Sequence, residues 1–600
     1  MGMFNFAQKT STHHLPRMII SHPSPTVSPF SSENQSALTQ WFNEQFNQGI
    51  TTQYADHILV QIHQAFDWTP LEQACANYHD ATQQRAPILH TVSRLIRAVV
   101  VKYLYGWSYR QTEEQIRHHL LVRWFVGYTP FAPTLDHSTL HLFALWLENH
   151  HPRLFFDEVL RQIDTAFPLQ HRRDQVGDTF ALRANAAWES LPALLRHTTA
   201  KLLRVCQQET PDHLDDLLAT VQTEQIFGPE KEKPEFCLTS SQFQERAVGI
   251  VQALQPFLSY LQHHQPWPSQ VTLWLGYLHK IIADEFTLER DATGHLQPVQ
   301  VKPLKEKGAY RLISATDPEA TLRVHGDQKD KGYNIQVATD GEFVTSIHAH
   351  TGSSPDSNGI ETLIADQKAH RGSVPPKLIY DKAAGSGKKL HDVHQASDGA
   401  TQLVTQRVDT HSRTNRFTAE QFSLTEEGGL TCPNGHTSYI SYRSGHAQGW
   451  NYRFAADVCT GCPLAQACRG QAVKPSAPRQ VFISDYLFLH RQALAYQQTP
   501  AFQADLKLRP VVERVIANLV QHGDARYAHG HGLAKADFQV KMCGMAFNLK
   551  TWMHKLEASR NAHLPLVAAT KPKRQSLVRQ VKSWLLSLPA HAEPTVGPPA

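Results

Sequence analysis

Two aspartates in separate parts of the chain stand where a carboxylate could bind a metal ion. Asp381 follows the apolar run Leu378-Ile-Tyr380 and precedes a stretch rich in Gly, Ser and Lys, and Asp178 follows Gln175-Val-Gly177. Both patterns predict a short strand that ends on its aspartate. In open α/β sheets, ligands bind beyond the carboxyl ends of the strands. For Asp381 there is an alternative, in which its side chain only caps the helix that follows.

Glu513 is the third candidate carboxylate. It lies in a predicted amphipathic helix whose apolar stripe consists of Leu508, Val511, Val512, Val515, Ile516, Leu519 and Val520. Pro510 suits the first helical position, so Glu513 would lie near the positive end of the helix dipole. The alternative is an exposed glutamate that pairs with a neighbouring arginine. Two aspartates and a glutamate suit two Mg²⁺ ions about 3.5–4 Å apart, which activate an attacking oxygen and stabilise a leaving one.

A second group of candidate metal ligands consists of four cysteines that are close in the sequence: Cys432, Cys459, Cys462 and Cys468. Four thiolates complete a tetrahedral Zn²⁺ site and leave no position open to water, so the spacing predicts a structural zinc ion. His436 could replace one cysteine. A redox or free-thiol cluster and a catalytic zinc ion are the alternatives.

The elements that precede the first aspartate are helical. From residue 39 to 168 the apolar residues follow a helical period, and Gly106 should end one helix before Ser108 and Gln111 form a capping box for the next. A helix, a short turn and a second helix are typical of a DNA-reading module. Basic residues accompany this outline: Arg94, Arg97, Lys102, Arg110, Arg117 and Arg123. A plain helical bundle is the alternative.

Strand character appears in the second half of the chain, at residues 309–315, 331–340, 343–350, 377–381 and 401–405. Asp340-Gly341 lies between two of these segments and predicts a hairpin. With a helix predicted near 360–368, the pattern indicates an α/β fold with one mixed sheet flanked by helices.

We therefore expect six regions along the chain. They are a flexible arm (1–38), a helical DNA-binding domain (39–168), a catalytic core (169–195, 300–410 and 476–556), a helical insertion (196–299), a cysteine-rich zinc-binding insertion (411–475) and a basic, proline-rich tail (557–600).

The composition limits the classes of partner. The net charge is only +4, so attraction to nucleic acid must come from local clusters of basic residues. Between residues 509 and 555 such a cluster includes Arg509, Arg526 and Lys535, interleaved with aromatic and amide residues. No apolar run approaches the roughly 18 residues of a membrane span, and we expect a cytoplasmic protein.

These motifs resemble those of a known family, the DDE transposases of bacterial insertion sequences. Residues 94–140 resemble the helical amino-terminal domain, Asp178-Thr-Phe-Ala-Leu182 the segment with the first catalytic aspartate, and Ile379-Tyr-Asp381 the strand with the second. Thr316-Asp-Pro-Glu-Ala320 with Gly332-Tyr-Asn-Ile-Gln336 resembles the central hairpin. Arg509-x3-Glu513 matches the middle of the signature Tyr-x2-Arg-x3-Glu-x6-Lys, whereas Leu506 and Val520 replace its two ends.

The resemblance implies an RNase H-like core with a zinc-ribbon-like insertion. It also implies cleavage of double-stranded DNA at transposon ends, transfer to target DNA by two Mg²⁺ ions, and a homodimer on DNA in the bacterial nucleoid. Asp178, Asp381 and Glu513 would bind the Mg²⁺ ions, and Arg110, Arg117, Arg509, Arg526 and Lys535 would contact DNA. A catalytically silent, zinc-stabilised DNA-binding protein is the main alternative, and a metal-dependent nuclease without strand transfer is another.

Overall fold

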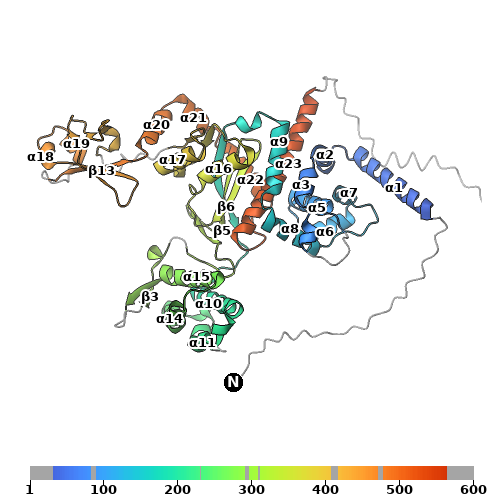
Figure 1. The fold of residues 1–600 in the computed structure, drawn as a ribbon, viewed down its shortest axis with the longest axis horizontal. Helices are drawn as coiled ribbons and strands as arrows, with labels where there is room; N and C mark the ends of the chain where they lie inside the picture. Colours follow the sequence, from blue (N-terminus) through green and yellow to red (C-terminus); the bar gives the residue numbers. More distant parts are fainter. Residues whose placement is uncertain are drawn as a thin grey trace, which may run out of the picture. The chain divides into compact units, whose positions relative to one another are not determined.

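The computed structural model describes residues 32–82, 90–229, 232–290, 296–308, 311–406, 416–470 and 477–563 (Figure 1). Residues 1–31 of the predicted arm and residues 564–600 of the predicted tail lie outside the described residues. The chain forms two compact units, with the boundary after Glu158. In the part that the structure describes, no helix is long and apolar enough to span a bilayer.

The first unit is helical throughout its described part. Its helices are α1 (Ser32–Gln53), α2 (Ile58–Ala65), α3 (Thr69–Ala74), α4 (Tyr78–Ala81), α5 (Val92–Tyr105), α6 (Tyr109–His118), α7 (Leu120–Val126) and α8 (His137–His150), and α9 (Leu154–Ala166) crosses the boundary. The predicted apolar face of α5 is confirmed, since Leu95, Ile96 and Val99 are fully buried.

Both predicted helix boundaries in this unit are confirmed. Gly106 ends α5 in the left-handed conformation, with φ of 66°, which a residue without Cβ adopts readily. Ser108 begins α6, where its hydroxyl accepts the backbone N–H of Gln111 and the Gln111 side chain accepts the N–H of Ser108. This reciprocal capping box satisfies two backbone donors that the helix itself leaves unpaired.

The second unit contains a six-stranded mixed sheet of order β4-β5-β1-β7-β8, with β6 paired to β5. Its strands are β1 (Gln175–Arg183), β4 (Thr321–His325), β5 (Gln328–Thr339), β6 (Val344–Thr351), β7 (Lys377–Ile379) and β8 (Gln402–Val404). β1, β5 and β6 are antiparallel neighbours, whereas β7 and β8 run parallel to β1. This arrangement is consistent with the RNase H-like core that the resemblance implies.

Two strand predictions need correction. The described residues of the segment 309–315 form no strand, because Leu312 and Ala315 pack into the core of the helical insertion instead. The neighbour of β5 in this region is β4, which was not predicted. In addition, Asp178 does not end its strand, since β1 continues to Arg183 along β5.

The predicted hairpin between β5 and β6 is confirmed. The carboxylate of Asp340 accepts the backbone N–H groups of Glu342 and Phe343, and Gly341 takes a φ of 95°. The aspartate thus satisfies the turn's donors, and the glycine allows the chain to reverse.

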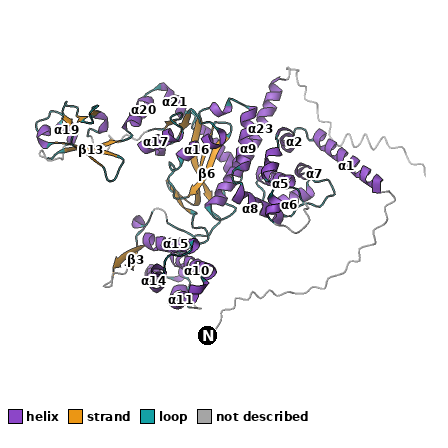
Figure 2. Ribbon diagram, in the orientation of Figure 1, coloured by secondary structure: helices purple, strands orange, loops and turns teal. Residues whose placement is uncertain are grey.

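Helices cover the sheet (Figure 2). Ala338, Leu378 and Tyr380 pack in one apolar cluster with α16 (Ile360–Arg371) and α17 (Gly387–Ala396). Helix α23 (Leu533–His563) lies along β6, where the Asn548 side chain bonds both backbone groups of Val344 and Asp537 accepts the N–H of Ala349. The last helix therefore occupies backbone groups that an edge strand would otherwise expose.

The segment Thr316-Asp-Pro-Glu-Ala320 caps helix α23. Asp317 accepts the N–H of Gly532, and Glu319 accepts the N–H of Leu533, at 3.2 and 2.8 Å. Carboxylates are favourable at the positive end of a helix. This motif thus has a structural role at the start of α23.

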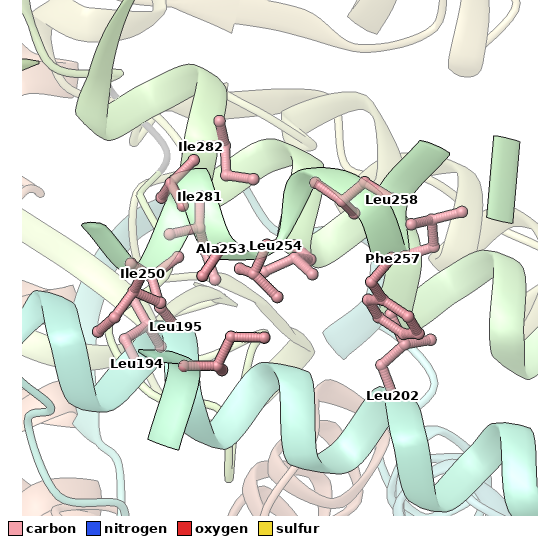
Figure 3. Packing of buried hydrophobic residues seen from close by; sticks show 14 of the residues in the cluster. Leu194, Leu195, Leu202, Ile250, Ala253, Leu254, Phe257, Leu258, Ile281 and Ile282 are labelled. Atoms are coloured by element: carbon pink, nitrogen blue, oxygen red, sulfur yellow. The ribbon is translucent and has the colours of Figure 1, made fainter. Parts of the chain in front are cut away.

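A helical insertion follows β1 and has its own core. Its elements are α10 (Leu191–Glu209), α11 (Leu214–Thr220), α12 (Thr223–Phe227), α13 (Ser240–Ala253), α14 (Gln255–His263), α15 (Ser269–Glu285), β2 (Phe286–Arg290) and β3 (Leu296–Val301). Figure 3 shows Leu195, Leu254 and Phe257 among the side chains that point toward one another from these helices. The insertion therefore buries its own apolar surface.

The cysteine-rich segment consists of short strands and helices. They are β9 (Ser423–Leu424), β10 (Leu430–Thr431), β11 (Thr437–Ser438), β12 (Ser441–Arg443), β13 (Gly449–Phe454), α18 (Ala456–Cys459), α19 (Ala465–Arg469) and β14 (Arg479–Ser484). The chain continues through α20 (Leu487–Gln497), α21 (Pro500–Leu506) and α22 (Pro510–Gln521) to α23.

Candidate active site

Asp178 and Asp381 lie at the same level of two adjacent strands. β1 and β7 pair in parallel, with Val176 opposite Ile379, so the same register continued by two residues places Asp178 opposite Asp381. Adjacent strands are about 4.7–4.9 Å apart, and residues two apart in a strand face the same side. The sheet register therefore brings these two predicted site residues together, although they are far apart in the sequence.

Arg509 links this pair of aspartates to the third candidate. It directly precedes α22, and its guanidinium lies 3.8 Å from the Asp178 carboxylate. Its Nε atom is buried and has no hydrogen-bond partner in the described chain. An unpaired buried donor is costly, which makes the Arg509 Nε a candidate to donate to a bound ligand.

Glu513 lies four residues after Arg509, in the first turn of α22. Residues four apart are neighbours on a helix surface, so Glu513 is next to the arginine that contacts Asp178. Pro510 is the first helical residue and Val512 and Val515 are buried, as predicted, while Glu513 is exposed. Helix α22 therefore carries Glu513 one turn after Arg509, in the favourable field of its own amino terminus. Among the residues that the structure describes, no three His, Cys, Asp or Glu side chains are close enough to hold a metal ion, so Glu513 does not form a closed cluster with the two aspartates.

The electrostatics of the aspartates favour a bound cation. Burial raises the pKa of Asp178, and the nearby Asp381 and Asp356 carboxylates raise it further, against the N–H of Thr179 and the Arg509 guanidinium. The pKa of Asp381 is also raised, by burial and by Asp356. A divalent cation would relieve both effects, since it compensates charges that burial disfavours.

The capping alternative for Asp381 also holds. Its side chain accepts the N–H of Ala383 at 3.0 Å, at the start of a short 3₁₀ turn, Lys382–Ala384. This bond fixes the carboxylate and still leaves lone pairs for a metal ion, because a carboxylate offers about four acceptor positions.

The prediction missed two charged residues beside the aspartates. Asp356, in the turn between β6 and α16, accepts hydrogen bonds from Thr179 and Asn334 and pairs with Arg323 of β4. Its sequence context, Ser-Pro-Asp-Ser-Asn, is typical of a turn. No local signal distinguishes it, because its partners come from strands that the fold brings together.

Comparison with known protein families gives evidence about the family of the chain that does not depend on the geometry of the site. A family model described as "Transposase DDE domain" matches residues 431–553, which contain Arg509 and Glu513 but neither aspartate. A second, described as "Transposase domain (DUF772)", matches residues 50–144. Both matches support a DDE transposase of an insertion sequence. No curated protein and no solved structure matches the chain.

The chain gathers its four clustered cysteines around one small cavity. Cys432, Cys459, Cys462 and Cys468 line about 30 Å³ of space together with His436. Gly435 and Gly461 have φ of 83° and 76°, which allows tight turns after Cys432 and between Cys459 and Cys462. Burial raises the pKa of Cys459 and Cys468. Within the described ranges, however, no three His, Cys, Asp or Glu side chains are close enough to hold a metal ion.

The residues predicted to contact DNA fall into two groups. In the second unit, Arg526 and Lys535 are exposed in and after the loop between α22 and α23. Lys541 and Lys555 of the same stretch pair instead with Asp537 and Glu342. The segment therefore divides into exposed cations and cations that stabilise the fold.

In the first unit, most basic residues of α5–α7 stabilise the helices. Lys102 and Arg123 are buried, and Arg123 donates to the backbone oxygens of Arg117, Thr129 and Ala132. Arg110 and Arg117 are exposed on α6, where Arg117 also pairs with Glu113. This leaves α6 as the helix of the predicted pair that displays basic side chains to solvent.

Proposed function

We propose that this transposase cleaves phosphodiester bonds at the ends of its insertion sequence and transfers the freed strand to target DNA. The observation that supports the proposal is the parallel register of β1 and β7, whose continuation by two residues would bring Asp178 opposite Asp381, together with the Arg509 guanidinium 3.8 Å from Asp178. Two carboxylates at one level of adjacent strands, with a third on a neighbouring helix, suit a pair of divalent cations.

Asp178, Asp381 and Glu513 would hold two Mg²⁺ ions. Bound there, the ions would supply activation of the attacking oxygen and stabilisation of the leaving oxygen. The carboxylates fit this task, because their raised pKa values reflect a site that favours a compensating positive charge.

Arg509 would bind a phosphate oxygen of the DNA end. Its buried and unpaired Nε supports this role, since a guanidinium can bond two phosphate oxygens at once. A phosphate held there would lie against the carboxylates, because Arg509 already contacts Asp178. The arginine would thus position the scissile end and weaken the repulsion between the DNA and the acidic site.

The test measures cleavage and strand transfer on supercoiled DNA that carries the terminal repeats of the element, with Mg²⁺ or Mn²⁺. Asp178→Ala, Asp381→Ala and Glu513→Ala should each abolish both reactions and retain DNA binding. Asp215→Ala, which removes an exposed carboxylate of the helical insertion, is the matched control and should react like the wild type.

The outcomes separate the alternatives. A wild-type protein that binds the repeats but never cleaves them would be a catalytically silent DNA-binding protein. Cleavage without any joined product would identify a metal-dependent nuclease. Full activity in any of the three acidic variants would refute the assignment of that residue.

A further inference from the structure

Asp356 contacts the neighbours of both catalytic aspartates. One of its carboxylate oxygens accepts the Thr179 hydroxyl at 2.7 Å, and its backbone oxygen accepts the Tyr380 hydroxyl at 3.0 Å. Thr179 directly follows Asp178, and Tyr380 directly precedes Asp381. A single residue outside the sheet therefore bonds to β1 and to the end of β7.

These two hydrogen bonds, called here the Asp356 bridge, lie just beyond the point where the backbone ladder between β1 and β7 ends. The ladder between β1 and β7 joins Gln175 with Leu378 and Val176 with Ile379, and both aspartates come after it. Beyond the last ladder pair, β1 remains paired with β5, and the Tyr380 N–H bonds to the Val404 oxygen of β8, but no backbone ladder joins β1 directly to the segment after β7. The Tyr380 ring also packs against Gly177, at 2.7 Å from the position a Cβ would take, so the side chains there are closely packed.

The Asp356 bridge lies on the face of the sheet opposite to the one on which the Asp178 and Asp381 side chains lie. Consecutive residues of a strand point to opposite faces of the sheet, so Thr179 faces away from the side on which Asp178 lies. The same alternation separates Tyr380 from Asp381. Asp356 can therefore hold both strands and leave the catalytic carboxylates free to face their substrate.

The charge of Asp356 is compensated locally. The oxygen that binds Thr179 also accepts from Asn334 at 2.9 Å and from Arg323 at 3.3 Å. Arg323 in turn donates to Thr179 and to Asn334, and its side chain is only 12% exposed. The other oxygen of Asp356 lies 3.7 Å from the exposed His325 ring. Thr179 of β1, Arg323 of β4, Asn334 of β5 and Asp356 of the turn after β6 thus form one hydrogen-bonded network.

We propose that Asp356 is a positioning residue that sets the spacing of Asp178 and Asp381 and thereby the affinity of the site for divalent cations. The inference rests on the proposed function, because it assumes that these two aspartates bind metal. Residues that orient metal ligands typically contribute about 10- to 100-fold to metal affinity or activity.

The experiment compares Mn²⁺ binding to the full chain, measured by titration calorimetry without DNA. Asp356→Ala should weaken binding about 10- to 100-fold. Asp356→Asn keeps the oxygen that accepts from Thr179, Asn334 and Arg323, and should bind Mn²⁺ within about threefold of the wild type. Thr179→Val removes only the hydroxyl of the bridge and should weaken binding in the same direction as Asp356→Ala, which provides a second variant if the alanine form does not fold.

Asp330→Ala is the matched control. It also breaks an Asp–Arg pair between β5 and β1, with Arg183 at 2.9 Å, but does not contact Thr179 or Tyr380. Its Mn²⁺ affinity should equal that of the wild type.

Three results would overturn the inference. Equal losses in Asp356→Asn and Asp356→Ala would mean that the carboxylate charge, rather than its hydrogen bonds, matters. Unchanged affinity in Asp356→Ala and Thr179→Val, with binding lost in Asp178→Ala, would refute the positioning role alone. Wild-type affinity in Asp178→Ala would instead refute the proposed function on which the inference rests.

Discussion

At the residue scale, the negative charges of Asp178 and Asp381 lower the stability of the folded chain. Burial is the largest cause that raises the pKa of each one, and negative charge nearby adds to it. Buried like charges are unfavourable unless a cation compensates them. Arg509 supplies part of that compensation to Asp178 in the chain alone. A bound cation, as proposed above, would supply further compensation.

This arrangement predicts how the stability of the metal-free protein depends on pH. A carboxyl group whose pKa is higher in the folded than in the unfolded chain binds its proton more tightly when folded. The free energy of unfolding should therefore fall as the pH rises from the ordinary aspartate range through the raised pKa. Asp178→Asn removes this effect and should unfold at a higher temperature than the wild type at neutral pH in EDTA.

Thermal unfolding between about pH 4 and 7 tests this prediction. The difference between Asp178→Asn and the wild type should shrink toward low pH, where the wild-type carboxyl is protonated too. Asp215→Asn, on the exposed surface of the insertion, should show no such difference. An Asp178→Asn protein less stable than the wild type at neutral pH in EDTA would contradict the electrostatic argument.

At the scale of elements, the cysteine-rich segment has a small apolar core and short strands. Phe422, Tyr452, Phe454 and Ile483 are buried there, and Cys432, Cys459 and Cys468 pack against them. Four of the six strands described there, β9 to β12, have only two or three residues and provide few ladder bonds, and so small a unit usually needs a metal ion or a disulfide for stability. The cysteines around the shared cavity would supply such a site.

We therefore predict about one zinc ion per chain in reduced, purified protein, bound by Cys432, Cys459, Cys462 and Cys468. Cys459→Ser with Cys462→Ser should remove the zinc and expose residues 416–470 to hydrogen exchange. Elemental analysis and exchange mass spectrometry measure the two effects. Cys237→Ser, which alters an exposed cysteine of the insertion, is the control. Zinc-free reduced protein with a protected segment would rule the site out.

At the scale of the whole molecule, the net charge of the chain is only +4, which is small for binding the polyanionic DNA that a transposase family implies. The local distribution of basic side chains therefore decides where DNA could bind. The fold buries several of these side chains, so they cannot contact DNA. Lys102, Arg123 and Lys541 are buried, whereas Arg110, Arg117, Arg526 and Lys535 are exposed. The exposed residues of each unit are therefore the candidates for phosphate and base contacts.

This division predicts two kinds of binding defect. Arg526→Ala or Lys535→Ala should weaken binding to all DNA sequences alike and reduce the salt slope by about one for each phosphate that the variant no longer neutralises. Arg110→Ala or Arg117→Ala should relax the preference for the terminal repeat, if α6 reads the major groove. Fluorescence anisotropy at several salt concentrations measures both.

A surface lysine elsewhere in the second unit provides the control for these four variants. Lys305→Ala removes an exposed lysine outside the cluster and should leave the salt slope and the sequence preference unchanged. Wild-type salt slopes and sequence preference in all four variants would place the DNA on another surface.

The sequence by itself determined the local features of this protein. Helical periodicity and caps predicted α5 and α6, Asp340-Gly341 predicted the hairpin, and Arg509-x3-Glu513 indicated the family. These features depend on residues within a few positions of one another, so their causes can be read directly along the chain.

Only the tertiary structure decided how the distant segments combine. The ladder of β1 and β7 ends at Val176 and Ile379, two residues before Asp178 and Asp381, and Asp356 bonds to the neighbouring Thr179 and Tyr380. The failed prediction at 309–315 has the same origin, since its apolar residues are buried in the insertion core rather than in the sheet. Strand pairing and burial are contacts between residues far apart in sequence, and local periodicity carries no information about which partner each apolar or charged side chain will meet.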